Sequence, residues 1–180
     1  MHPVIWTGAV GLAIAGGWMD WRSRRIPNWL TLSGFAAGIA LNAVLGGGNG
    51  ALGALAGAGL ALAVLFPFVF LRGLGAGDWK LMGALGAFLG VRGILLVLLA
   101  TILVNGMMAI IQVARQRRWQ ATLNNLRQLV LGFFYLGIRP NPVVTLDNPQ
   151  LTKLPFGVAA AFATAFCSIL VWSEWMQKQL

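Results

Sequence analysis

The chain has 180 residues, of which 58% are hydrophobic and 9% are charged, and its mean hydropathy is +0.78. Soluble domains carry about 25% charged residues, so this composition excludes an ordinary soluble fold, and the high hydrophobicity excludes intrinsic disorder. The net charge of +9 does not indicate nucleic-acid binding, because the basic residues punctuate apolar runs and do not line a polar face. The single cysteine, Cys167, excludes an intramolecular disulfide and a multi-cysteine zinc cluster. The sequence therefore predicts one polytopic membrane domain over residues 1–180.

Apolar runs with the length of membrane spans recur along the chain. A transmembrane helix needs about 20 apolar residues. No charged residue occurs between Arg25 and Arg72, and the glycine-rich segment 46–50 divides this long stretch in two. A shorter run follows Lys80. We expect an all-α bundle of six transmembrane helices, the fourth one short, over residues 3–19, 29–45, 51–71, 81–91, 93–114 and 154–172.

The basic residues predict the orientation of these spans. Cytoplasmic loops of membrane proteins carry an excess of Lys and Arg. If the loop 20–28 is cytoplasmic and the sides alternate, every Lys and Arg except Arg92 and Lys178 lies on the cytoplasmic side. A five-span chain, with the fourth and fifth helices fused, would scatter these residues about evenly. We therefore expect an even number of spans with both termini outside.

The predicted cytoplasmic loop 115–153 is the one sizeable segment outside the membrane. Its basic cluster 115–118 suits a topology anchor or a contact with anionic lipid headgroups. Apolar residues then recur at helical spacing, which is typical of an amphipathic helix in the membrane interface; they are Trp119, Leu123, Leu126, Leu129, Val130, Phe133 and Phe134. The loop is either a connector on the membrane surface or a docking site for a substrate.

The chain has only four acidic residues, and two of them stand out by their position. Glu174 and Asp147 fall in polar segments and are predicted to be solvated. Asp20 and Asp78 lie at the cytoplasmic ends of the first and fourth predicted spans, and thus at the same depth. Acids beside membrane spans are costly and usually mark a cavity or a functional path.

Two aspartates at one depth allow three interpretations. If the two side chains face each other, ionising both at once is costly, so one aspartate keeps its proton near neutral pH. Such a pair activates water with one member and protonates a leaving group with the other. The same acids would serve a proton- or cation-coupled transporter. Alternatively Asp20 pairs with Arg22 or Arg24, and Asp78 pairs with Lys80, in purely structural ion pairs.

The residues around the two aspartates form motifs. Residues 20–28 read D-x-R-x-x-x-I-P-N, residues 75–80 read G-x-G-D-x-K, and Lys-Leu-Pro-Phe-Gly at 153–157 opens the last predicted span. With these motifs and six predicted spans, the chain resembles the type IV prepilin peptidase family. The members of that family are GxGD-type intramembrane aspartic proteases. The resemblance covers essentially the whole chain.

The resemblance implies both an activity and a catalytic pair. The family removes the short basic leader from type IV pilin and pseudopilin precursors at the cytoplasmic face of the bacterial inner membrane. The chemistry of an aspartic protease needs neither a metal nor a cofactor. Asp20 and Asp78 correspond to its catalytic aspartates, although the resemblance does not say which one is the general base. The alternatives are a small coupled transporter and a non-catalytic scaffold of a pilus or secretion machine.

The neighbours of the aspartates have weaker assignments. Arg22 and Lys80 either bind substrate and tune the acids, or simply anchor the topology. Gly75 and Gly77 leave room for the backbone to approach a substrate and for unusual dihedral angles before Asp78, or else form a plain turn. Pro27 suits the first turn of the second helix.

The first cytoplasmic loop separates this chain from larger members that it resembles. Those enzymes carry an extra domain with paired cysteines near the N-terminus, and they also N-methylate the new terminus. Here the loop 20–28 is short and contains no cysteine. We therefore expect the short, peptidase-only form, with neither methyltransferase activity nor zinc.

Overall fold

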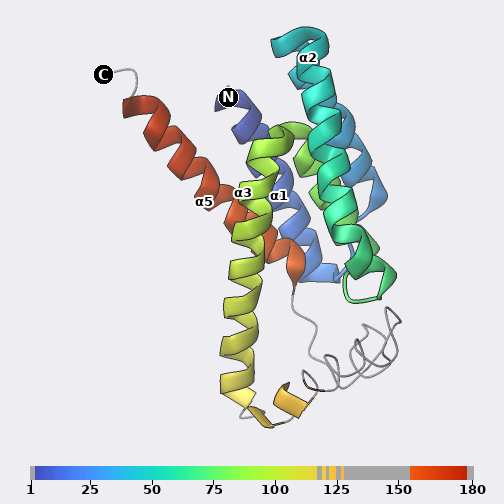
Figure 1. Cartoon of the computed structure of the whole chain (residues 1–180), viewed down its shortest axis with the longest axis vertical. Coiled ribbons are helices and arrows are strands. Elements are labelled where there is room, and N and C mark those ends of the chain that lie inside the picture. Colours follow the sequence, from blue (N-terminus) through green and yellow to red (C-terminus); the bar gives the residue numbers. More distant parts are fainter. Residues whose placement is uncertain (1–2, 117–118, 121, 125–126, 128–154, 178–180) are drawn as a thin grey trace.

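The computed structural model describes a helical protein. Its helices are α1 (Pro3–Ser23), α2 (Asn28–Phe70), α3 (Ala76–Gln116) and α5 (Phe156–Gln177) (Figure 1). No strand occurs in the residues that the structure describes, which are 3–116, 119–120, 122–124, 127 and 155–177. The expected all-α fold is therefore confirmed for this part of the chain.

Helix α2 is broken at Gly47, inside the glycine-rich segment that the sequence analysis singled out. Gly47 has φ 60° and ψ −147°, a conformation in which a side chain would be strained. A Cβ atom on Gly50 would meet the backbone of Asn42. In a straight helix, two residues that are eight positions apart lie too far from each other for such a contact. The chain therefore reverses here, and α2 consists of two adjacent arms (Figure 1).

Helix α3 is broken in the same way at Gly90, which has φ 62° and ψ −173°. Its first arm begins at Ala76, which is earlier than the predicted start of the fourth span at Leu81. The GxGD motif therefore ends inside a helix, because Asp78 belongs to the first turn of α3. The second arm contains the predicted fifth span, 93–114.

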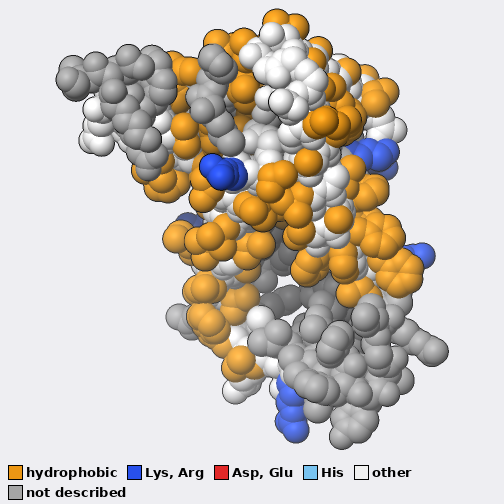
Figure 2. Space-filling view, turned by 45° about the horizontal axis from the view of Figure 1, so that its top comes forward, with side chains coloured by type: hydrophobic (Ala, Val, Ile, Leu, Met, Phe, Trp, Pro, Cys, Tyr) orange, Lys and Arg blue, Asp and Glu red, His pale blue; other side chains and the backbone are white. Residues whose placement is uncertain are grey.

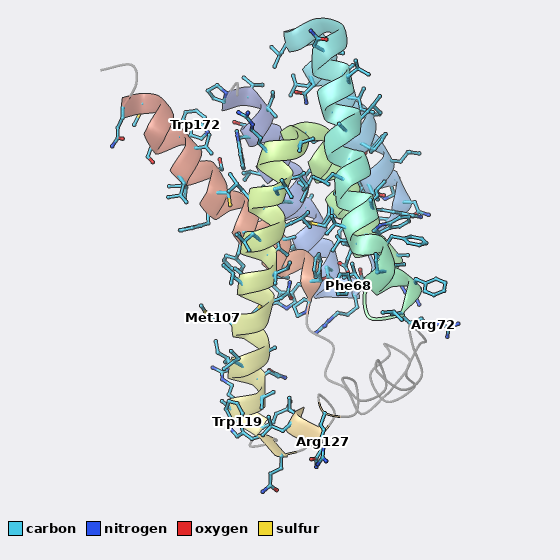
Figure 3. All side chains as sticks on the ribbon, viewed as in Figure 1. Phe68, Arg72, Met107, Trp119, Arg127 and Trp172 are labelled. Atoms are coloured by element: carbon cyan, nitrogen blue, oxygen red, sulfur yellow. The ribbon has the colours of Figure 1, made fainter. Side chains whose placement is uncertain are left out.

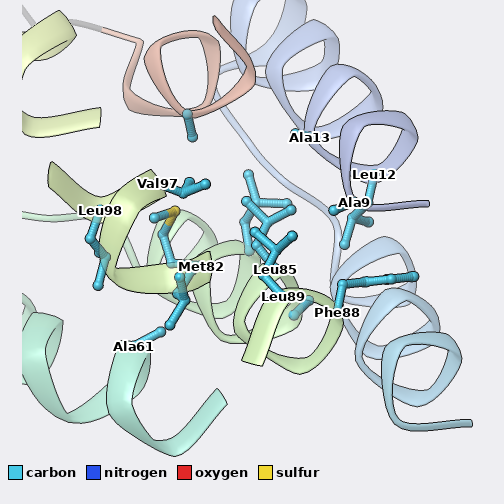
Figure 4. Packing of buried hydrophobic residues seen from close by; sticks show 14 of the residues in the cluster. Ala9, Leu12, Ala13, Ala61, Met82, Leu85, Phe88, Leu89, Val97 and Leu98 are labelled. Carbon is cyan, nitrogen blue, oxygen red and sulfur yellow. The ribbon is translucent and has the colours of Figure 1, made fainter. Parts of the chain in front are cut away.

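The first arm of α3 forms the centre of the molecule. Every residue from Leu81 to Leu89 is buried, which is the pattern of a helix surrounded on all sides. Figure 4 shows Met82 beside Val97 of the second arm, and Phe88 on the side of α1. Helix α3, which carries Asp78, contacts α1, α2 and α5.

Small and polar residues bring α2 and α3 together. A Cβ atom on Gly86 would lie 2.5 Å from the carbonyl oxygen of Gly57, so only glycine allows this approach. The Asn42 amide donates to the carbonyl oxygens of Gly38, Ala87 and Phe88 at 3.0, 3.0 and 2.9 Å. This side chain thus ties the first arm of α2 to the end of the first arm of α3.

Three of the described helices are long and apolar enough to cross a membrane, namely α2, α3 and the Phe156–Ser173 part of α5. Large apolar side chains are exposed on all three, as expected for lipid contact, and Figure 2 shows hydrophobic atoms over much of one face. The chain is thus a membrane protein of several apolar helices. The expected number of six spans remains a prediction.

Beyond Met107, α3 continues past the end of α1 and the start of α5, toward the helical residues around Trp119 (Figure 3). Trp119 and Leu123, the first two apolar positions of the predicted interfacial helix, are helical and exposed. The rest of that helix, most of the loop 115–153, Asp147 and the side chain of Glu174 lie outside the described residues.

Candidate functional site

Five helix ends meet at one end of the bundle. They are the ends of α1 and α2 and the starts of α2, α3 and α5, and the start of α1 and the end of α5 lie at the opposite end (Figure 1). Asp20 is in the last turn of α1, and Asp78 is in the first turn of α3. The fold thus brings the two predicted catalytic residues to the same end of the molecule.

Asp20 is buried, with 7% of its surface exposed, and it is held by α5. The backbone N–H of Gly157 donates to Asp20 Oδ2 at 2.9 Å. The first N–H groups of a helix have no partner within the helix, so the carboxylate of Asp20 caps α5. Gly157 is a site residue that the sequence analysis did not identify, although it belongs to the Pro-Phe-Gly motif quoted there.

The absence of a side chain at Gly157 makes this contact possible. A Cβ atom there would lie 2.9 Å from Asp20 Cβ and 3.2 Å from Asp20 Oδ2. Both distances are shorter than an ordinary contact, which starts at 3.4 Å. A larger residue would therefore displace the carboxylate.

The carboxyl group of Asp78 is held less completely than that of Asp20. Its Oδ1 is buried and has no hydrogen-bond partner among the described residues. A Cβ atom on Gly75 would lie 2.9 Å from its Oδ2. The two aspartates also interact electrostatically with each other. The structure therefore holds a pair of acids with one unpartnered, buried oxygen.

The glycines of the GxGD motif provide space and not unusual dihedral angles. Among the described glycines, positive φ occurs at Gly47 and Gly90, so the expectation of such angles at Gly75 and Gly77 is wrong. A Cβ atom on Gly77 would lie 3.2 Å from Ile26 Cβ, and this contact packs the start of α3 against the segment between α1 and α2.

The segment between α1 and α2 is only four residues long, and its ends are fixed. Arg24 has φ 53°, and its N–H donates to the Asp20 carbonyl oxygen at 2.9 Å, which ends α1 with a left-handed cap. Pro27 lies at the N-cap of α2, with φ −71° and ψ 146°, and not in the first turn as predicted. Both features fix the backbone close to Asp20.

The two basic candidates differ in their surroundings. Lys80 Nζ donates to Asn28 Oδ1 at 2.9 Å and so joins the starts of α3 and α2. Arg22 is exposed in the last turn of α1. On the part of the surface that Figure 2 describes, no acidic side chain is visible, in keeping with the burial of Asp20.

Comparisons with known proteins give one family and one relative. The model of the Type IV leader peptidase family matches residues 8–110, which include both aspartates. A protein of Aeromonas hydrophila named prepilin leader peptidase/N-methyltransferase is 32% identical over 126 residues, with 57% of this chain and 43% of the relative covered. The chain thus matches less than half of the length of that relative. No solved structure gives a significant match.

Proposed function

Because the chain belongs to the type IV leader peptidase family, we propose that it is a membrane-embedded aspartic endopeptidase. Its substrates would be type IV pilin-like precursors, both prepilins and pseudopilins, from which it removes a short basic leader. The name of the Aeromonas hydrophila relative supports this substrate class. The observation that carries the proposal is the pairing of Asp20 and Asp78 at one end of the bundle.

The pair supplies what peptide hydrolysis needs. The ionised aspartate takes a proton from water, and the water oxygen forms a bond to the scissile carbonyl carbon. The neutral aspartate then gives its proton to the amide nitrogen as the C–N bond breaks. The product is a free carboxylate on the leader and a free amine on the mature protein. This sequence uses the two carboxyl groups and one water molecule, so the proposal includes neither a metal nor a cofactor.

The proposal places the two aspartates at the cytoplasmic face of the inner membrane. The breaks at Gly47 and Gly90 divide α2 and α3 into two arms each. If all arms cross the membrane together with α1 and α5, there are six spans and both termini are outside. The basic residues near the acids, among them Arg22 and Lys80, then face the cytoplasm and anionic lipid headgroups.

The short segment between α1 and α2 supports a peptidase without methyltransferase activity. Only residues 24–27 separate the two helices, and none of them is a cysteine. We therefore expect the product to keep an unmodified amino terminus when the protein is supplied with a methyl donor. Mass spectrometry of the mature product tests this expectation.

The test of the proposed function is cleavage of a prepilin-type precursor by the purified protein in liposomes. The protein should release the leader at one peptide bond, and EDTA should leave the rate unchanged. A precursor in which the residue before the cleavage site is changed to proline serves as the control.

Two outcomes would favour the other interpretations. A coupled transporter would give substrate-dependent proton movement across the liposome membrane and no cleavage. A scaffold would give neither cleavage nor proton movement. Failure to cleave several precursors from the same cell as the enzyme would contradict the proposal.

A further inference from the structure

The first turn of α5 makes the two acids of the site unequal. Asp20 Oδ2 accepts a buried hydrogen bond from Gly157 N–H, whereas Asp78 Oδ1 is buried without a partner among the described residues. Without this bond the helix dipoles would favour the charge on Asp78, because Asp20 lies in the last turn of α1 and Asp78 lies in the first turn of α3. The difference between them comes from a helix that enters the site from the far end of the chain.

We propose that Gly157 is a positioning residue that keeps the negative charge of the pair on Asp20. Asp20 is then the base that activates water, and Asp78 is the acid that protonates the leaving nitrogen. This assignment rests on the proposed peptidase function. It adds a third position, on α5, to the machinery.

The physical reason is the hydrogen bond itself. An N–H donor stabilises the charged form of a carboxyl group, and the positive end of the α5 dipole acts in the same direction. An unpartnered buried oxygen is less costly on a neutral acid than on an anion, which favours the proton on Asp78. Asp78 also lies in a first helical turn, but a direct hydrogen bond to a charged group outweighs a dipole alone.

Other charged groups around Asp20 do not replace this contact. From α3, Asp78 and Lys80 are the titratable residues of the first arm, and Lys80 is hydrogen-bonded to Asn28. Neither α2 nor the first half of α5 carries a charged side chain. The remaining described cations at this end belong to the end of α1, the residues that follow it and the segment between α2 and α3; they are Arg22, Arg24, Arg25 and Arg72, and all are exposed.

The first test compares two glycine variants on the same helix pair. In Gly157→Ala the new Cβ atom pushes the Asp20 carboxylate away from the N–H group. In Gly11→Ala, on α1, the new Cβ atom meets no atom within 4 Å, so it adds the same methyl group without disturbing Gly157 or the Asp20 carboxylate. Both are assayed for kcat/KM against pH on a prepilin-type precursor.

The acidic limb of the plot of kcat/KM against pH is the decisive readout. Loss of the hydrogen bond makes the charged form of the pair less stable, so protonation stops the reaction at a higher pH. We expect the limb to move upward by about one pH unit in Gly157→Ala and to stay in place in Gly11→Ala. A limb that stays at the wild-type pH in both variants would overturn the proposal.

A second measurement uses the wild-type protein and needs no activity. The amide proton of Gly157, observed by NMR with glycine labelled in nitrogen-15, should shift with pH as the charge on Asp20 is lost. An amide signal that does not move across the acidic range would overturn the assignment. If the wild-type protein cleaves no precursor, the proposed function fails, and this titration still decides where the charge lies.

Discussion

Replacing Gly75 by alanine tests how closely the backbone controls the position of Asp78. The new Cβ atom would lie 2.9 Å from Asp78 Oδ2, whereas an ordinary contact begins at 3.4 Å. The carboxyl group must therefore move by about 0.5 Å or turn away. Because a misplacement of about 1 Å can cost 100-fold in rate, we expect kcat/KM to fall by about 10- to 100-fold.

Gly73→Ala is the matched control in the same segment. Its new Cβ atom would lie 3.5 Å from the Phe68 carbonyl oxygen, which is an ordinary contact. Both variants should unfold thermally within a few degrees of the wild-type protein, and kcat/KM is measured well below that temperature. The reasoning would be refuted by wild-type activity in Gly75→Ala, or by an equal loss in both variants.

Substitutions at three further positions, with Gly53→Ala as a control, test the fold by thermal unfolding in detergent. Gly86→Ala places a Cβ atom 2.5 Å from the Gly57 carbonyl oxygen and should lower the free energy of unfolding by about 1–3 kcal/mol. Gly53→Ala, which meets no atom within 4 Å, should change it by less than about 1 kcal/mol, and equal losses would contradict this packing. Asn42→Leu should cost about 1 kcal/mol, because three carbonyl groups lose their donor, and an unchanged midpoint would contradict that role. At position 24, with φ 53°, the glycine variant should be about 1–2 kcal/mol more stable than the alanine variant, and the reverse order would refute the left-handed cap.

Much of the fold could be predicted because membrane helices follow from local composition. The glycine-rich segment 46–50 indicated a reversal, and the break lies there at Gly47. The start of α3 was placed too late, at Leu81, because the small and polar residues of the GxGD motif look like a turn. In the structure, tertiary contact of Gly77 with Ile26 allows the helix to begin at Ala76.

The candidate site was predictable only in part. Asp20 and Asp78 were identifiable because acids are scarce in this chain and lie at one predicted depth. The role of Gly157 could not be read from the sequence, because a backbone N–H leaves no signature in the residue type. The unusual backbone expected at Gly75 was wrong for a related reason, since a glycine needed for space and a glycine needed for positive φ look the same in a sequence.

The most direct test of the aspartate pair measures cleavage by Asp20→Asn, Asp78→Asn and the double variant beside the wild-type protein. Asparagine keeps the size of the side chain and an oxygen that can accept the Gly157 N–H, so all four proteins should fold. Residues that act as one unit are not additive. The kcat/KM of each single variant should therefore fall by at least about 1,000-fold, and the kcat/KM of the double variant should fall no further than that of the single variants. Cleavage near the wild-type rate by either single variant would contradict the account.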